Sequence, residues 1–569
     1  MKRSWWIVIL LFTLASASAL EVQQVRWGFD GTVVPGRFNL LSVLVGNPST
    51  APFDGTVNLY KSRGMDHVGA LYASPSYISP LTTRWVQFYV YIENQYDQWR
   101  IEWGRGPDNH HDLDPPKWGP PGLVLLSDSQ TTIDAISALR QFPEELFPAT
   151  VAATGGLDSL VLDHAPRWEL AKRQAFLDWL RAGGKVHLLT AADGRHPAFS
   201  DELSILNSSQ ERMQVGAGLV FRHSVTARQI RPLDLEDNDV PLRKYTPGEM
   251  GDSQATESFL RSLAQLSNPN HHWGLIYLLA LAYLGMAGPG TLLLGKRFSD
   301  YRLRIALLLA TVATFAGLFA VAGRRGQGEL SSVHTLSYAH SIDGDNYDVM
   351  QWINVFATHG AHYTITHAAP HNLYATGQDY EEVKGWIQSG KDGRIMVDIP
   401  MFSRRAVLHQ AVMKGANFSV KIANWDGAGA LNKMTLTVQP ELTKQILEGW
   451  VVQGDQVYPM QMVDGRLEFG NGGRQSLSTL SAAQPSYGYT YGNPNQAAEV
   501  EGEFRKLAAP LMAWSLDTKD FTNAAAPAVT GRADLFLFTR SPENFAITGP
   551  KFGQEVGYVL YHLDLFRPE

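Results

Sequence analysis

Residues Trp273–Leu294 read WGLIYLLALAYLGMAGPGTLLL and residues Ile305–Gly323 read IALLLATVATFAGLFAVAG, with no charged side chain in either stretch. Each is long enough to cross about 30 Å of hydrocarbon as an α-helix. The two stretches therefore predict a transmembrane hairpin with spans at 273–294 and 305–323. A kink is expected near Pro289, because proline lacks the helical N–H donor. The alternative, a buried helical hairpin in a water-soluble core, is disfavoured by the basic loop between the two stretches.

The loop between the spans, residues 295–304, carries four basic side chains and one acidic side chain, Asp300. Loops rich in Lys and Arg stay on the cytoplasmic side of a membrane. The hairpin is therefore expected to enter from outside, turn in the cytoplasm and return. Nearly all of the chain would then lie outside the cytoplasm. The basic residues of the loop are Lys296, Arg297, Arg302 and Arg304.

The N-terminus supports the same orientation. A basic start at Lys2 and Arg3 is followed by an apolar stretch at 5–14 and by small residues that end in Ala17-x-Ala19. These are the three parts of a secretory signal peptide, so residues 1–19 are predicted to be removed. An uncleaved membrane anchor is the alternative, for which the apolar stretch is short. Together with the hairpin, this predicts a protein of a bacterial inner membrane whose bulk lies in the periplasm.

Composition excludes several classes of function. The 569 residues include 48 Lys and Arg against 55 Asp and Glu, which gives a net charge of −7. A nucleic-acid partner is not expected, because the chain has no basic footprint. There is no cysteine, which excludes disulfides, thiolate metal sites and every mechanism that uses a cysteine nucleophile.

Residues 20–115 show the pattern of short antiparallel strands. Apolar and polar side chains alternate through 41–45 and 85–91, and turn dipeptides occur at Asp30-Gly31 and Asn47-Pro48. Strands of this length and spacing are typical of a β-sandwich of immunoglobulin-like size. Residues 106–121, rich in Pro, Asp and His, are expected to be a linker.

The pattern changes at residues 120–268. Three fully apolar runs, at 123–126, 160–162 and 186–189, alternate with helical segments. A helix is expected over 132–141, and a second one should follow Pro166 and end at Gly183. Buried strands that alternate with helices predict a parallel sheet with crossover helices.

A helix that ends in Trp179-Leu180-Arg181-Ala182-Gly183-Gly184-Lys185 and runs into the apolar strand Val186–Leu189 resembles the class I glutamine amidotransferase-like domain of large bacterial membrane proteins. In such proteins a secreted β-sandwich precedes this domain and transmembrane helices follow it. The resemblance implies a flavodoxin-like α/β fold and a cysteine nucleophile. Because the chain has no cysteine, the fold is expected without the chemistry, and no catalytic residue is predicted.

Residues 327–569 are predicted to form a β-rich extracytoplasmic region. Strand patterns occur at 363–365, 394–397, 418–422 and 556–560. Short helices are expected at 442–449 and 501–509, the second ending where Pro510 would interrupt it.

Histidines are concentrated in part of this region, since six of the 17 lie between His334 and His371. Imidazole and carboxylate groups are ligands of zinc. The spacing singles out His359, His362 and His367 as candidate zinc ligands, with Asp343, Asp345 and Asp348 nearby. The alternative is a set of surface and strand-edge histidines without a metal. Grouped aromatic side chains leave glycan binding open.

These features together predict a multidomain protein without enzymatic activity, anchored in the lipid bilayer. It would serve as a scaffold or interaction protein of a Gram-negative-type envelope and would bind other envelope or membrane proteins. The alternative is a metal-binding or glycan-binding module, or a hydrolase, with its site in the C-terminal region. No cofactor other than zinc is expected.

Overall fold

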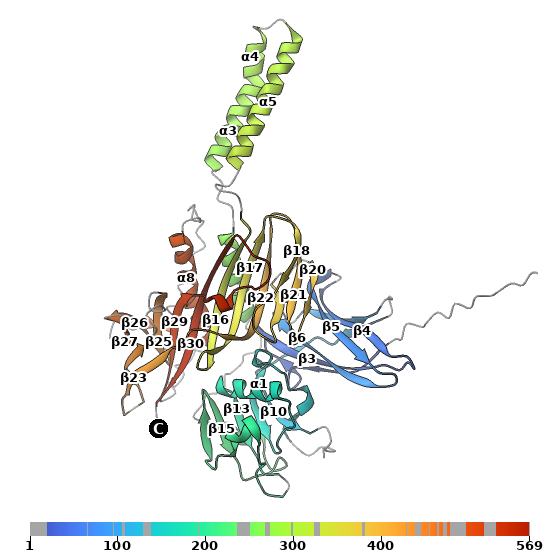
Figure 1. Cartoon of the computed structure of the whole chain (residues 1–569), viewed down its shortest axis with the longest axis vertical. Coiled ribbons are helices and arrows are strands. Elements are labelled where there is room, and N and C mark those ends of the chain that lie inside the picture. The colour runs from blue at the N-terminus through green and yellow to red at the C-terminus, as the bar shows by residue number, and fades with distance from the viewer. Residues whose placement is uncertain are drawn as a thin grey trace, which may run out of the picture.

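The computed structural model describes most of residues 20–567 (Figure 1). The undescribed positions within that range are 65, 95, 105–108, 129–137, 192, 236–250, 268–272, 298–299, 324–329, 378–381, 428, 438–444, 455, 464–465, 470–474, 478, 480–496 and 517–530. The predicted signal peptide, residues 1–19, lies outside the described residues. The described part is mainly β-structure, and one helical hairpin projects from it.

The N-terminal strands form two facing sheets. Strands β1, β3 and β6 make a three-stranded antiparallel sheet, while β4, β5, β7 and β8 belong to a second sheet. The sequence predicted this sandwich, but it predicted a linker at 106–121, where β8 and β9 lie instead. The strands are β1 Glu21–Trp27, β2 Thr32–Val33, β3 Arg37–Gly46, β4 Phe53–Arg63, β5 Asp66–Ile78, β6 Thr83–Ile92, β7 Gln98–Trp103, β8 His110–Leu113 and β9 Lys117–Trp118.

A six-stranded sheet in the order β11-β10-β12-β13-β15-β14 follows, parallel except for β14. Helix α1, Leu170–Arg181, packs on one face of it and ends at Gly183, whose φ of 114° is the left-handed conformation that suits glycine. Residues 140–141, predicted as the end of a helix, lie in β11. The strands are β10 Gly122–Ser127, β11 Arg140–Pro143, β12 Leu157–Leu162, β13 Lys185–Leu188, β14 Arg212–Val215 and β15 Gly218–Arg222.

The C-terminal region forms a twelve-stranded sheet and supplies three strands to the N-terminal sandwich. The twelve are β16 Ser332–Asp343, β17 Asn346–Ala357, β19 Leu373–Thr376, β22 Ser403–Lys414, β23 Ser419–Trp425, β24 Leu431–Thr437, β25 Ile446–Gln453, β26 Gln456–Val463, β27 Arg466–Phe469, β28 Gln475–Ser476, β29 Arg532–Arg540 and β30 Gln554–Phe566. The three that join the sandwich are β18 Ala361–Ile365, β20 Glu382–Gln388 and β21 Arg394–Ile399.

Two helices in this region depart from the sequence prediction. The described part of the predicted helix 442–449, from Ile446 onward, is strand β25. The predicted helix 501–509 is confirmed, but it belongs to a longer helix, α8 (Ala497–Leu516), which continues through Pro510. The chain after Pro510 keeps apolar side chains such as Leu511 and Met512 fully buried, so packing offsets the lost backbone hydrogen bond.

The N-terminal and C-terminal regions share one sheet and one core. Strand β20 pairs in parallel with β5, with Trp386 opposite Leu71, and this pairing closes a seven-stranded sheet in the order β18-β21-β20-β5-β4-β7-β8. Val57 and Ile101 lie in the same buried cluster as Ile353. The two regions, which the sequence could not place relative to each other, therefore form a single body.

Helix α2, Gly251–Leu266, connects this body to the hairpin. Its apolar side chains pack against the twelve-stranded sheet, and its buried Thr256 contacts both halves of the chain. The Thr256 hydroxyl lies 2.9 Å from the Tyr91 hydroxyl of β6 and accepts a hydrogen bond from the Trp352 indole N–H of β17 at 3.3 Å. The N-terminal half of α2 is thereby fixed to both halves of the chain.

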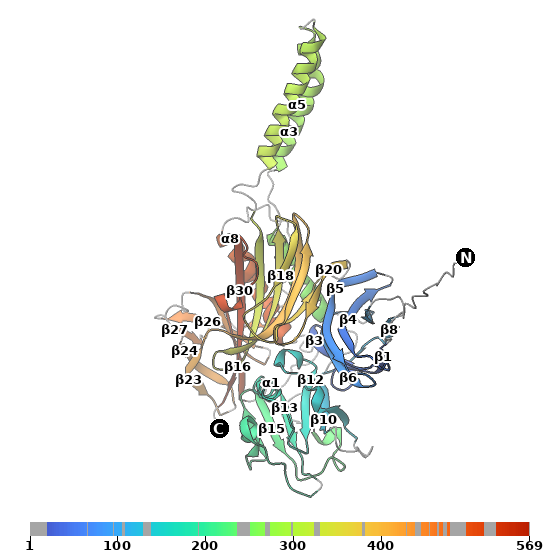
Figure 2. The ribbon, with the colours of Figure 1, turned by 45° about the vertical axis from the view of Figure 1, so that its right-hand side comes forward.

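The hairpin consists of α3 (Trp273–Gly285), a π-helical turn at Met286–Gly290, α4 (Thr291–Gly295) and α5 (Tyr301–Gly323). The π-turn contains Pro289, where the sequence predicted a kink. The windows Gly274–Leu293 and Tyr301–Val321 are long and apolar enough to cross a membrane, and only 0% and 11% of their residues are buried. Both views show the hairpin standing away from the sheets (Figures 1 and 2). The alternative of a helical hairpin buried in a soluble core therefore does not fit the structure.

Candidate functional site

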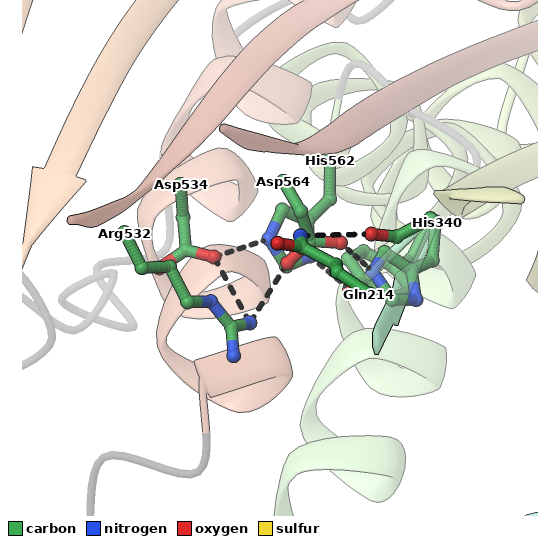
Figure 3. Close-up of polar contacts among 8 residues, drawn as sticks. Gln214, His340, Arg532, Asp534, His562 and Asp564 are labelled. Carbon is green, nitrogen blue, oxygen red and sulfur yellow. Dashed lines mark hydrogen bonds and ion pairs between the residues drawn. The ribbon is translucent and has the colours of Figure 1, made fainter. Parts of the chain in front are cut away.

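A group of charged and imidazole side chains lies on three adjacent strands of the twelve-stranded sheet. His340 of β16 is opposite His562 of β30, and Asp564 of β30 is opposite Asp534 of β29. Alternate residues of a strand share one face, so these side chains point to the same side of the sheet. Their strands also carry the apolar side chains that pack beneath α8. We call His340, His562, Asp534, Asp564 and Arg532 the polar cluster (Figure 3).

Hydrogen bonds and ion pairs connect the members of the polar cluster. The His340 Nε2 atom lies 2.8 Å from one Asp564 carboxylate oxygen, and the Arg532 guanidinium lies 2.8 Å from the other. The His562 Nε2 atom lies 3.0 Å from Asp534, and its Nδ1 atom lies 2.6 Å from the Tyr338 hydroxyl. The two imidazole rings stack with their centroids 4.6 Å apart. The contacts fix the position of every ring and carboxylate in the cluster.

The electrostatics of the polar cluster centre on the Asp564 carboxylate. Burial would raise the pKa of the Asp564 carboxyl, but His340, His562 and Arg532 outweigh it and hold that pKa well below its usual range. Burial lowers the pKa of His562 and so favours its neutral form. The Asp564 carboxylate is therefore held between an imidazole and a guanidinium, with His340 on one oxygen and Arg532 on the other.

The same side chains can supply metal ligands. One donor atom from each of His340, His562 and Asp564 lies within 4.8 Å of the others, and among the described residues this is the one group of three or more histidines and acids to meet that criterion. Two imidazoles and a carboxylate are a donor set that zinc and similar divalent ions accept. In the present geometry the His340 and Asp564 donors are hydrogen-bonded to each other, so a metal would have to replace that bond.

The three histidines predicted as zinc ligands do not form such a group. His359 is exposed, and His362 is exposed on β18, 3.8 Å from Asp398. His367 is buried, with its Nδ1 atom 2.8 Å from the Tyr374 hydroxyl and its ring stacked on His409 at 3.8 Å. His359 precedes β18, His362 lies on it and His367 follows it. Two of the side chains face solvent and the third is buried, so their donor atoms do not converge.

The acidic residues considered with these histidines have other partners. Asp345 forms an ion pair with Lys414, and Asp348 accepts hydrogen bonds from the Gln410 amide. Asp343 lies at the end of β16, with its carboxylate 3.8 Å from Arg181. Of the histidines between 334 and 371 that the structure describes, His340 joins a group of converging donor atoms, and the other members come from the C-terminal end of the chain.

A second polar group lies at the carboxyl edge of the α/β sheet, where open sheets of this kind bind ligands. The imidazole of His164 lies 2.8 Å from Asp163 and 3.3 Å from Glu144. Burial would lower the pKa of His164, but the two carboxylates raise it. Glu144 also accepts hydrogen bonds from Arg167 N–H and, through its carbonyl, from Trp168. The group therefore has a structural role, because it stabilises the segment that precedes α1.

Comparisons with known proteins do not identify a family for this chain. No family model matches the chain, and no curated protein matches it. One similar solved structure is a cycloisomaltooligosaccharide glucanotransferase of Paenibacillus sp. complexed with cycloisomaltoheptaose, which is 8% identical. The alignment covers 80% of this chain and 98% of that chain with a TM-score of 0.17. A similarity this low does not bear on the fold or function of the present chain.

Proposed function

We propose that the protein is a membrane-anchored scaffold whose folded body lies outside the cytoplasm of a bacterial cell and binds other envelope proteins. The observation that supports this most directly is the contrast between the hairpin and the body. The hairpin's apolar side chains are exposed, whereas the segments before and after it, α2 and β16, pack together in one core. A hairpin that spans a bilayer leaves both flanking segments on the same face, as that shared core requires.

The orientation rests on the sequence. Lys296, Arg297, Arg302 and Arg304 surround the turn between the two helices, and basic loops stay in the cytoplasm. The proposal therefore assigns the body to the periplasm of a cell with an inner membrane, and it includes removal of residues 1–19. The resemblance of residues 120–268 to the amidotransferase-like family also stays a proposal. The parallel order β10-β12-β13-β15 is compatible with it.

Cysteine labelling tests the orientation, and the native chain has no cysteine to give background. Ser79 and Asn544 are exposed on the body, and Asp300 is exposed in the turn of the hairpin. In spheroplasts, a membrane-impermeant maleimide should label S79C and N544C, while D300C should react only after the membrane is permeabilised. Labelling of D300C in intact spheroplasts, together with protection of the other two, would reverse the proposed orientation.

A second candidate function is favoured by the polar cluster, whose His340, His562 and Asp564 could hold a divalent cation. In that case the intact protein, purified with zinc in all buffers and then desalted, should retain about one equivalent of metal by elemental analysis. The H340N variant should lose it, and the matched control H362N, altered at an exposed histidine, should keep it. Native protein without bound metal would reject this candidate and leave the scaffold proposal intact.

A further inference from the structure

Three large apolar side chains are exposed at one end of the body. Leu330, Met401 and Phe402 have exposed fractions of 57%, 63% and 55%. Leu330 comes just before β16, and the other two form the turn between β21 and β22. We call these three residues the apolar tip.

Strand register places the apolar tip at the end of the body from which the hairpin leaves. Ser332, the first residue of β16, is opposite Phe356, and Ser403, the first residue of β22, is opposite Ala357. Because β16 and β22 flank β17, the turn before β22 lies about 10 Å from the start of β16. Both views show the hairpin beyond this end of the sheet (Figures 1 and 2).

The covalent connections keep this end near the hairpin. The described residues on either side of this connection are Ser267 and Trp273, the first residue of α3. Extended backbone of this length reaches at most about 20 Å, so the two residues lie no farther apart than that. Ser267 is fixed to the body by hydrogen bonds to His334 and Asn354. The Arg404 guanidinium, next to the tip, donates to the Ala264 carbonyl near the end of α2. The apolar tip is therefore held close to the point where α3 begins.

The turn itself presents its apolar side chains outward at a conformational cost. Phe402 has a φ of 55°, a left-handed conformation that bulky residues rarely adopt. The turn is closed by a 3.2 Å hydrogen bond from the Ser403 N–H to the Pro400 carbonyl. A strained aromatic residue that remains exposed is a reason to look for a binding role.

The side chains that flank the tip in sequence or across the strands are basic or imidazole groups. His359, His362, Arg404 and Lys551 are all exposed and lie at strand ends or loops of this same end. Arg404 and Lys551 give the apolar protrusion cationic neighbours, an arrangement found on protein surfaces that rest on anionic lipid. The acidic side chains at this end include Glu555, whose carboxylate accepts a hydrogen bond from the Phe552 N–H, and Asp398, 3.8 Å from His362.

We propose that the apolar tip inserts into the interface of the lipid bilayer on the periplasmic face, beside the hairpin. This inference rests on the proposed function, because it requires that the hairpin span the membrane. Insertion would give the body a third attachment in addition to its two covalent connections. The body would then have a fixed tilt on the membrane and would present one constant face to its partners.

Fluorescence quenching in the full chain tests the proposal. Single cysteines at F402C, at L284C in α3 and at Q210C in the α/β unit each receive an NBD label, and the protein is reconstituted into vesicles of phosphatidylcholine and phosphatidylglycerol. Leu284 is an exposed apolar residue of the hairpin, whereas Gln210 is exposed far from it. Doxyl-labelled lipid should quench roughly half of the emission at position 402 and at 284, and almost none at 210.

The three positions distinguish the two proposals. Quenching at 284 without quenching at 402 would overturn insertion of the apolar tip and leave the membrane hairpin intact. Absence of quenching at both positions would overturn the membrane hairpin together with the tip. A further variant, M401S with the label still at 402, should reduce the quenching at 402, because it removes the large apolar side chain that remains in the turn.

Discussion

Acidification from pH 7 to pH 5 is expected to lower the free energy of unfolding by about 3–6 kcal/mol through three buried histidines. Burial lowers the pKa of His187 to about 3, of His334 to about 4 and of His367 to about 3. The buried His409, whose pKa burial also holds well below its usual value, acts in the same direction as these three. In the unfolded chain their pKa is about 6.5. Between these values the unfolded state binds more protons, so stability falls as the pH falls below about 6.5.

Urea unfolding of the intact protein in detergent, followed by tryptophan fluorescence at pH 7, 6 and 5, measures this dependence. Each histidine should contribute about 1–2 kcal/mol between pH 7 and pH 5. The H334N variant keeps a polar group near Ser267, its hydrogen-bond partner, and should lose its share of the dependence. H362N, at an exposed histidine, is the control and should behave like the native chain. Equal stability at pH 5 and pH 7 would contradict the prediction.

Replacing Asp564 by alanine is expected to destabilise the C-terminal sheet by about 3–5 kcal/mol, the cost of leaving buried charges without their partner. The Asp564 side chain is only 5% exposed and contacts both Arg532 and His340. Because its pKa is held below the usual range, its contribution is present above the unfolded pKa of about 3.9 and is lost as the pH falls below it.

The measurement for D564A is the urea midpoint at pH 7. E555A, which removes an exposed carboxylate from the same strand, is the control and should shift the midpoint little. D564N keeps the shape and one acceptor oxygen and should fall between D564A and the native chain. If D564A and E555A had equal effects, the polar cluster would not be an energetic unit of the sheet.

The sequence predicted those features that depend on local pattern. The two long uncharged apolar stretches predicted the helical hairpin. The alternation of apolar strands with a helix that ends at Gly183 predicted α1 and its neighbouring strands. Helical spacing at 442–449 was misleading, because Ile446 and its neighbours pair with β29. Pro510 predicted the end of a helix, but α8 continues through it, because apolar side chains on both sides of Pro510 pack into the core.

The candidate site depends on pairings that no local pattern contains. The motif Tyr338-x-His340 and the motif His562-x-Asp564 each alternate as a strand requires. They meet only because β16 and β30, more than 200 residues apart, pair in parallel. A search for polar residues at alternate positions of otherwise apolar strands would have selected both motifs. Their register could not have been read from the sequence, nor could the pairing of β20 with β5.

The shared seven-stranded sheet has a consequence for how the protein is made. Strand β5 precedes the hairpin in the chain, whereas its partner β20 follows the hairpin, so in the proposed topology β5 is exported first. In that topology, the edge of β5 that pairs with β20 stays unpaired until the second half of the chain has crossed the membrane. Unpaired strand edges invite aggregation. If the proposed topology holds, a nascent chain arrested within the hairpin should need a periplasmic chaperone, and the order of export would set the order of folding.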